Sequence, residues 1–274
     1  MIVDAHQHLW DPRTADYPWL EPGVLDRVYT QADVAEELRA AGVEKTVLVQ
    51  AADNVEDTGN MLREAERDPT IAGVVVWLPL TRPAEAGALL DRWAGAPIVG
   101  ARHLIHRDPD PEWLLRPDVA DGLELLADRG LTFDACAESP ALLAQVPVVA
   151  AAHPRLRLVL DHLGKPPIAA RGWEPWAGLL ADAAAAPNVV AKVSGLNTAG
   201  PAEAFGPYVS YALEVFGPER LMYGGDWPFA LLAAGSYAEI HAGLVNAIPA
   251  QARPAVLGGT AERVYRLAGK ENAF

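Results

Sequence analysis

Cysteine is nearly absent from the sequence, since Cys136 is the only one in 274 residues. A single thiol cannot form a disulfide within the chain. Proteins without disulfides are typical of reducing compartments, so we expect a cytoplasmic protein. A lone cysteine can also be a catalytic thiol, but a free cysteine usually packs as a small buried hydrophobe. The sequence therefore favours a packing role for Cys136.

Basic residues are also scarce. The chain has 22 Lys and Arg against 36 Asp and Glu, a formal net charge of -14. Binding to nucleic acid or to an anionic membrane surface needs clustered positive charge, so this balance argues against both kinds of partner. A few basic side chains in a cleft can still bind a small anionic molecule, because net charge acts mainly on long-range steering.

Long apolar runs are missing as well. The run over residues 73–80 is far shorter than the roughly 20 residues that a membrane-spanning helix needs. Residues 2–6 have the pattern of a strand and lack the basic and apolar segments of a secretory signal, so we expect no such signal. These absences predict a soluble protein that binds a small molecule, either as a monomer or as a homodimer.

The chain shows a regular alternation of two kinds of segment. Short runs rich in Val, Ile and Leu alternate with longer amphipathic stretches rich in Ala and Leu, the pattern of parallel strands joined by crossover helices. We predict strands at residues 2–6, 45–50, 71–78, 98–104, 131–135, 157–162, 189–194 and 221–226. Helices are expected at 30–41, 56–67, 83–93, 117–129, 140–152, 173–185, 201–216 and 237–247, with one or two more at 251–268.

Eight strand and helix units in this length predict a (β/α)8 barrel with extra C-terminal helices. Several predicted helices begin on Pro and end near Gly, as helix capping preferences require. A doubly wound open sheet is the alternative fold, but no G-x-G-x-x-G motif follows any predicted strand. Because no linker or repeat marks a boundary, we predict a single domain over residues 1–274.

A His-x-His motif closes the first predicted strand. Side chains two apart on a strand project from the same face, so the imidazoles of His6 and His8 should point the same way. Such a pair can bind one metal ion or one substrate oxygen, or it can pack in a polar core. A site is favoured because polar residues recur at the ends of later strands, where barrels carry their active sites. They are Gln50, Arg102, His103, Asp134, Asp161, His162, Lys192, Ser194 and Asp226.

Part of this polar set can bind a metal. A donor set suited to one divalent ion such as zinc consists of His6, His8, His162 and Asp226. Asp226 can instead act without a metal as the general base on water. Strand alternation turns Asp161 away from His162, so we assign Asp161 a structural role. Asp4 lies deeper on the first strand and is expected to support the histidines.

The connection over residues 9–29 is longer than most loops that follow a barrel strand and is rich in Pro, Trp and Tyr. In a barrel it lies at the catalytic mouth, either as a lid or pocket wall or as a loop packed over the barrel end. Residues 107–116 have a similar composition and are expected to form another wall.

Six segments also match a known pattern. They are residues 4–12 (DAHQHLWDP), 17–20 (YPWL), 100–104 (GARHL), 161–166 (DHLGKP), 192–196 (KVSGL) and 225–228 (GDWP), and they span nearly the whole chain. Together they resemble the amidohydrolase superfamily, in particular its amidohydrolase-2 branch of barrel hydrolases, which includes sugar lactonases. Binuclear members of the superfamily carry a metal-bridging Lys at the end of the fourth strand. Arg102 and His103 occupy that place here, so we expect one metal ion, or a site that works without one.

The resemblance implies a hydrolase that opens a sugar lactone of the L-fuconolactone or L-rhamnonolactone type. Asp226 and His162 are then the predicted catalytic residues, with Asp226 taking a proton from the attacking water. The histidines either hold a metal that polarises the ring carbonyl or donate hydrogen bonds to the developing oxyanion. The predicted substrate-binding residues are Gln50, Trp77, Arg102, His103, Asp134, Lys192 and Trp227.

Other interpretations remain open at this point. Arg102 can serve a salt bridge inside the barrel, Lys192 can pair with Asp134 or Glu138, and the tryptophans can belong to the core. A metal-dependent decarboxylase of the same superfamily, acting on an aromatic or unsaturated carboxylic acid, is the alternative enzyme. The non-enzymatic alternative is a protein that binds sugar acids.

Overall fold

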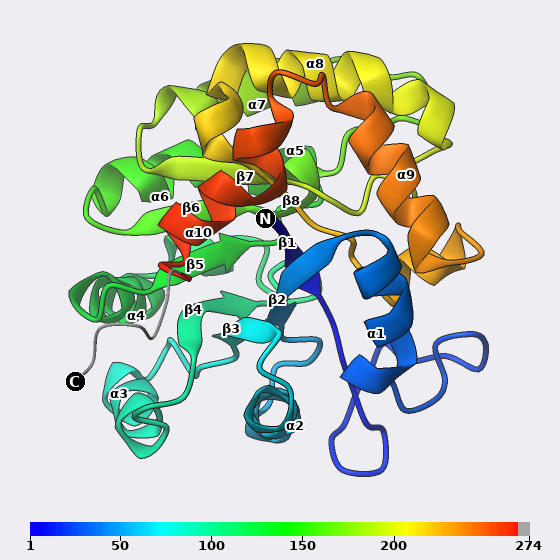
Figure 1. Cartoon of the computed structure of the whole chain (residues 1–274). Helices are drawn as coiled ribbons and strands as arrows, with labels where there is room; N and C mark the ends of the chain where they lie inside the picture. Colours follow the sequence, from blue (N-terminus) through cyan, green and yellow to red (C-terminus); the bar gives the residue numbers. More distant parts are fainter. Residues whose placement is uncertain (268–274) are drawn as a thin grey trace.

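The centre of the molecule is a ring of parallel strands (Figure 1). The structure is a computed structural model of the chain and describes residues 1–267. Eight strands pair in sequence order, each with the next. They are β1 (Ile2–Gln7), β2 (Val43–Val49), β3 (Ile71–Val76), β4 (Ile98–His103), β5 (Thr132–Ala135), β6 (Arg157–Leu160), β7 (Val189–Val193) and β8 (Leu221–Tyr223). Strands in such a ring are buried on both faces, which explains their continuous apolar runs.

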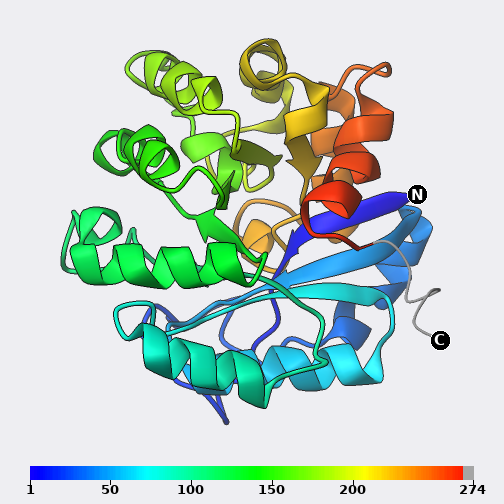
Figure 2. The same ribbon diagram turned by 90° about the vertical axis from the view of Figure 1, so that its left-hand side faces the viewer.

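The helices form the outer layer around this ring (Figure 2). They are α1 (Gln31–Ala40), α2 (Val55–Arg67), α3 (Pro83–Arg92), α4 (Pro117–Asp128), α5 (Pro140–Leu143), α6 (Val146–Ala152), α7 (Trp176–Ala185), α8 (Phe205–Phe216) and α9 (Tyr237–Ala247). The predicted (β/α)8 barrel is thus confirmed. One predicted helix, over residues 140–152, is two helices, because Pro147 has no N–H to donate and its ring crowds the carbonyl of Leu143, where α5 ends. No helix within residues 1–267 combines the length and the apolar character needed to cross a bilayer.

The barrel closes between β1 and β8 just beyond the short strand β8. The backbone N–H of Asp226 donates to the carbonyl of His6 at 2.7 Å, and the N–H of His8 donates to the carbonyl of Trp227 at 2.7 Å. These two bonds join the end of the first strand to the segment after the last. They therefore place the His-x-His motif directly beside Asp226.

The C-terminal segment covers the opposite end of the barrel. A π-helical turn (Ala255–Gly259) leads into α10 (Thr260–Val264), which lies over the end where β1 begins (Figure 1). Ala261, Val264 and Tyr265 join a core inside the barrel with Val3 and Met222. The helices expected over residues 251–268 are confirmed up to this point, and residue 268 lies outside the described part of the chain.

The connection after β1 is packed against the body of the barrel. Trp10, Tyr17 and Tyr29 are all buried, and their rings contact one another through Trp10. The Tyr17 hydroxyl donates to Asp57 Oδ1 at 2.8 Å, and the backbone N–H of Ala51 donates to Asp57 Oδ2 at 2.9 Å. Asp57 on α2 therefore anchors this connection.

Replacing Asp57 by asparagine tests this anchor through pH. Burial raises the pKa of Asp57 from 3.8 to about 6, and the hydrogen bonds from Ala51 and Tyr17 offset only part of the effect. The folded state then keeps a proton that the unfolded chain has released, so the stability contributed by Asp57 falls as the pH rises from about 4 to about 6. The unfolding free energy of Asp57→Asn, relative to wild type, should rise by about 2 kcal/mol between these pH values. Urea unfolding at both pH values measures it, and a constant difference would contradict the raised pKa.

Candidate active site

A pocket of about 230 Å³ opens at the carboxyl ends of the strands. Part of its lining comes from the predicted polar set, namely His8, Arg102, His162 and Asp226. One further side is polar, with His106, Arg107, Glu138, Lys165 and Thr198, and another is apolar, with Trp19, Leu104, Phe229 and Leu232. Trp19 belongs to the connection after β1, so this connection supplies a pocket wall as well as packing over the barrel end.

The two histidines of β1 share one face of the barrel interior. His6 Nε2 lies 3.1 Å from His8 Nε2, and both residues are buried. His8 Nδ1 donates to the carbonyl of Val49 on β2 at 2.7 Å, which fixes the ring and directs Nε2 toward His6. Both imidazoles thus meet at one point, as the sequence predicts, although the pairing of β1 with β2 is irregular between Asp4 and Gln7 and His8 lies one residue beyond the strand.

Asp226 reaches the same point from beyond β8, which ends at Tyr223. Its Oδ1 lies 3.4 Å from His8 Nε2 and 3.7 Å from His6 Nε2. The turn that carries it must pass close to β1, since a Cβ on Gly224 would lie 2.5 Å from the Cβ of His6. Asp4 Oδ1 secures this approach by accepting the N–H of Gly225 at 2.8 Å and that of His6 at 3.0 Å.

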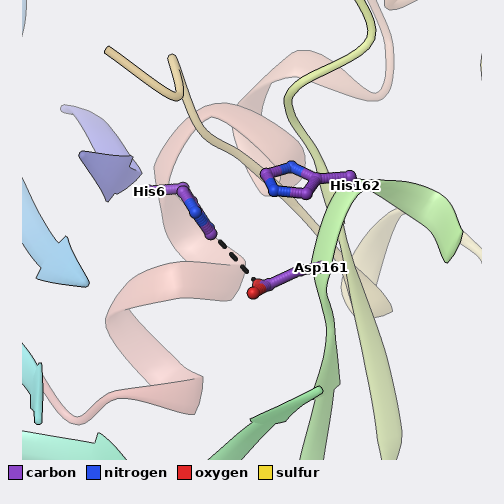
Figure 3. A group of neighbouring side chains, drawn as sticks. All are labelled: His6, Asp161 and His162. Carbon is purple, nitrogen blue, oxygen red and sulfur yellow. Dashed lines mark ion pairs between the residues drawn. The ribbon is translucent and has the colours of Figure 1, made fainter. Parts of the chain in front are cut away.

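His162 and Asp161 both point into the centre, and the prediction that Asp161 faces away is wrong. Strand β6 ends at Leu160, and the next residues form a tight turn in which His162 has φ 55°. Asp161 continues the inward direction of Val159, which belongs to the core inside the barrel, and the turn brings His162 to the same side. Figure 3 shows Asp161 facing His6, with the His162 ring beside them. The distance from Asp161 Oδ1 to His6 Nδ1 is 3.3 Å. His162 Nδ1 lies 2.9 Å from Ser194 Oγ.

A buried network of four charges lies beneath the histidines. Lys192 Nζ lies 2.6 Å from Asp134 Oδ2 and 3.1 Å from Asp161 Oδ1, while Arg102 Nη1 donates to Asp161 Oδ2 at 3.0 Å. Asp134 also accepts the Tyr265 hydroxyl at 2.7 Å. Buried charges are tolerated when they are paired in this way. Lys192 thus pairs with Asp134 and Arg102 forms a salt bridge inside the barrel, and Arg102 also lines the pocket.

The electrostatic environment keeps His6, His8 and Asp226 in their unprotonated forms. Burial lowers the pKa of His8, and burial together with the Lys192 charge lowers that of His6 well below its ordinary value. Burial would raise the pKa of Asp226, but the electrostatic influence of the neighbouring histidines, that of His162 first, holds it well below its usual range. At neutral pH the two β1 imidazoles are therefore neutral and Asp226 is ionised.

Three donor atoms are spaced as a metal site requires. Ligands of a tetrahedral zinc ion lie about 3.3 Å apart, and the atoms His6 Nε2, His8 Nε2 and Asp226 Oδ1 are separated by 3.1, 3.4 and 3.7 Å. His162 forms a second, overlapping group with His6 and Asp161, and the predicted four donors do not all lie within 4.8 Å of one another. The residues fit one divalent ion, with His162 at its edge.

The other predicted substrate-binding residues do not line the pocket. Trp77 and Trp227 pack elsewhere, with the ring of Trp227 against Tyr29. His103 stacks on Trp113 and pairs with Asp108 at 2.8 Å. The buried residues Gln50, Asp134 and Lys192 lie behind the lining, since Gln50 bonds to the Arg102 carbonyl and the other two belong to the charge network.

In the polar wall of His106, Arg107, Glu138 and Lys165, only Arg107 belongs to a segment that the sequence predicts as a pocket wall, residues 107–116. Three of these residues follow β4 and β5 by a few positions and stand in loops, where side chains have no fixed periodicity. The position of these residues in the sequence was an indication of their role, because the loops after barrel strands build the pocket. Lys165 stands in the DHLGKP segment that the sequence comparison had marked.

The barrel and its pocket of histidines, aspartate and arginine at the carboxyl strand ends define an enzyme of the (β/α)8 class. The chain belongs to the amidohydrolase family, whose model, described as Amidohydrolase, matches residues 3–267. The family predicted from the six segments and the prediction of a hydrolase are thereby confirmed.

Individual relatives agree with this assignment. The chain is 36% identical over 283 residues to an L-fucono-1,5-lactonase of Burkholderia ambifaria, covering 97% of this chain and 95% of that protein. An L-fucono-1,5-lactonase of Burkholderia multivorans is 35% identical over 287 residues, with 97% and 96% covered. The crystal structure of an amidohydrolase from Burkholderia multivorans with bound zinc has a TM-score of 0.89 and 34% identity, covering 98% of this chain and 100% of that one.

Proposed function

We propose that the protein hydrolyses a sugar-derived lactone, with substrates of the L-fuconolactone or L-rhamnonolactone type. The observation that carries this proposal is the Asp226 carboxylate held beside His6 and His8 at a pocket of about 230 Å³. The similarity to L-fucono-1,5-lactonases supports the same reaction over the decarboxylation alternative.

Asp226 acts as the general base in this mechanism. It takes one proton from a water molecule as the water oxygen attacks the ring carbonyl carbon. The tetrahedral intermediate then collapses, the bond between the carbonyl carbon and the ring oxygen breaks, and the proton passes from Asp226 to the leaving ring oxygen. The products are a hydroxyl group and a carboxylic acid on one open chain, the acid then releases the second proton of the water to solvent, and Asp226 returns to its ionised state.

His162 and Arg102 stabilise the charge that develops on the carbonyl oxygen. The Ser194 hydroxyl can donate to His162 Nδ1, which leaves the ring proton on Nε2 as a donor. The Nε of Arg102 has no hydrogen-bond partner within the described residues, although it is buried at the pocket wall. Fixed donors of this kind lower the barrier when they point at the developing oxyanion.

A divalent ion, for which we propose zinc, would be held by His6, His8 and Asp226 with His162 beside it. When bound, it would supply Lewis acidity to the carbonyl oxygen and lower the pKa of a bound water. The general base and the two donors described above belong to the chain itself and serve the reaction with or without the ion.

The two walls of the pocket suit a sugar ring. Glu138, Lys165 and Thr198 offer acceptors and donors for hydroxyl groups, whereas Trp19 and Phe229 offer apolar contact to a ring face or methyl group. A panel of aldonolactones, assayed by acid release with and without chelator and added zinc, tests the proposal. We expect turnover of six-membered 6-deoxy lactones. Carbon dioxide release from aromatic carboxylic acids without lactone opening would instead establish the decarboxylase.

Replacing Gly195 by alanine tests how closely the backbone at this position packs against His162 and Asp226. Gly195 adopts φ 60°, and a Cβ there would lie 2.5 Å from His162 Nδ1 and 3.0 Å from Asp226 Oδ2. Gly195→Ala should therefore displace both side chains and lower kcat by about 100-fold, the usual effect of misplacing reacting groups by an ångström. Gly206→Ala on α8 is the matched control, because nothing lies within 4 Å of its Cβ. Equal kcat values for the two variants would contradict this geometry.

A further inference from the structure

Lys192 has an unusual position for a lysine. It is 0% exposed, on the apolar strand β7, and its ammonium nitrogen has three acceptors within hydrogen-bond distance. They are Asp134 Oδ2 at 2.6 Å, His6 Nδ1 at 3.0 Å and Asp161 Oδ1 at 3.1 Å. An ammonium group has three hydrogens and no acceptor, so it can donate to Asp134 Oδ2 and to His6 Nδ1, whereas its contact with Asp161 Oδ1 is an ion pair without a hydrogen bond. His6 Nδ1 must then be the unprotonated nitrogen of its ring.

The contacts of the other ring nitrogens lead to the same tautomer. His8 Nδ1 faces the carbonyl of Val49 at 2.7 Å and must carry a hydrogen, so His8 Nε2 presents a lone pair. His6 Nε2 lies 3.1 Å from that lone pair. Two facing lone pairs at this distance repel each other, whereas a hydrogen on His6 Nε2 makes the contact a hydrogen bond. The nearest competing donor to His6 Nε2, Arg102 Nη1, is farther away at 3.5 Å and already bonds to Asp161.

We propose that Lys192 holds His6 in the tautomer protonated at Nε2 and thereby opposes metal binding at the His6, His8 and Asp226 site. A metal ligand must present a lone pair, so an ion can bind His6 Nε2 only after the proton has moved to Nδ1. This inference rests on the proposed metal site and is independent of which lactone is hydrolysed.

Asp161 favours the other tautomer of His6, in which the hydrogen is on Nδ1. Its Oδ1 lies 3.3 Å from His6 Nδ1, and it can accept the hydrogen of the metal-ready tautomer once Lys192 turns away. A carboxylate that accepts from the second nitrogen of a ligand histidine is a common support of metal sites. Lys192 and Asp161 therefore compete for the same ring nitrogen, and the balance between them sets the affinity of the site for a metal. The net protonation of the ring is unchanged in this exchange, because Nε2 releases one proton to solvent and Nδ1 takes one up.

Long-range ¹H–¹⁵N correlation spectra of histidine-labelled, chelator-treated full-length protein test the tautomer without any assay of activity. His6 signals are assigned by their loss in His6→Gln. We expect His6 protonated at Nε2 in the metal-free protein and at Nδ1 after one equivalent of zinc is added. His8 is the internal control, because its Nδ1 should stay protonated in both states. A metal-free His6 protonated at Nδ1 would overturn the proposal, and it would leave lactone hydrolysis untouched.

Two variants test Lys192 and Asp161 separately. The measured quantity is the affinity of each variant for zinc, determined by competition with a chromophoric chelator. Lys192→Met should bind zinc at least about tenfold more tightly than wild type, and Asp161→Asn at least about tenfold more weakly, the range found for such supporting partners. Unchanged affinity in a folded Lys192→Met would contradict the role of Lys192. Lys192→Met leaves two buried carboxylates with less positive charge, so its fold is checked by circular dichroism. The wild-type spectra decide the tautomer even when this variant does not fold.

Discussion

Asp226→Asn is expected to lower kcat for lactone opening by at least about 1000-fold, because an amide cannot take the proton of the attacking water. The backbone should be undisturbed. Asp226 has φ 57°, in the left-handed region that asparagine adopts more readily than most residues. The substitution therefore removes the base and keeps the turn. Steady-state kinetics on the best lactone of the panel measure the effect, and thermal unfolding checks that the fold is intact.

Asp11→Asn is the matched control for this variant. Asp11 stands at the start of the connection after β1, and its carboxylate pairs with the exposed side chain of Arg13 at 2.7 Å. Surface pairs of this kind contribute little to stability, so the control should keep wild-type kcat and unfolding temperature. If Asp226→Asn kept a rate near that of the control, another group would have to be the base.

The part of the site that lies on regular strands could be predicted from the sequence. His6 and His8 share a face as period-two spacing predicts, and the irregular pairing of β1 between Asp4 and Gln7 turns that face inward. Arg102 lies on β4 and Lys192 on β7, and both point into the barrel by the same period-two spacing. The sequence left open whether these two cations bind substrate or form a buried charge network, because the periodicity of a strand shows the direction of a side chain and not its partner.

The residues beyond the strand ends could not be placed in this way. The side chain of His162 joins the centre beside that of Asp161 only because β6 stops at Leu160 and the chain turns with a positive φ at His162. Tyr265, whose hydroxyl bonds to Asp134, is 131 positions away in the chain, and no local pattern announces such a contact. These cases share one cause, since tertiary contacts and not local periodicity decide the conformation there.

Arg102→Met is expected to lower the free energy of unfolding by about 3 kcal/mol, because removing one partner of a buried ion pair leaves the other charge uncompensated. Asp161 would lose its 3.0 Å bond from Arg102 Nη1, and the buried carbonyl of Gln50 would lose its guanidinium donor. The network then holds two carboxylates against the single ammonium of Lys192. Urea unfolding of both proteins at neutral pH measures the difference.

Arg107→Met makes the same chemical change at the mouth of the same pocket, but Arg107 is exposed. We expect its unfolding free energy to stay within about 0.5 kcal/mol of wild type, as is usual for surface positions. The double variant Arg102→Met with Asp161→Asn removes one charge of each sign and restores the balance of the network. It should therefore be less destabilised than the sum of its two single variants by at least about 1 kcal/mol. Additive losses would show that Arg102 and Asp161 act independently, and the charge network would then not be the unit that holds His6 in place.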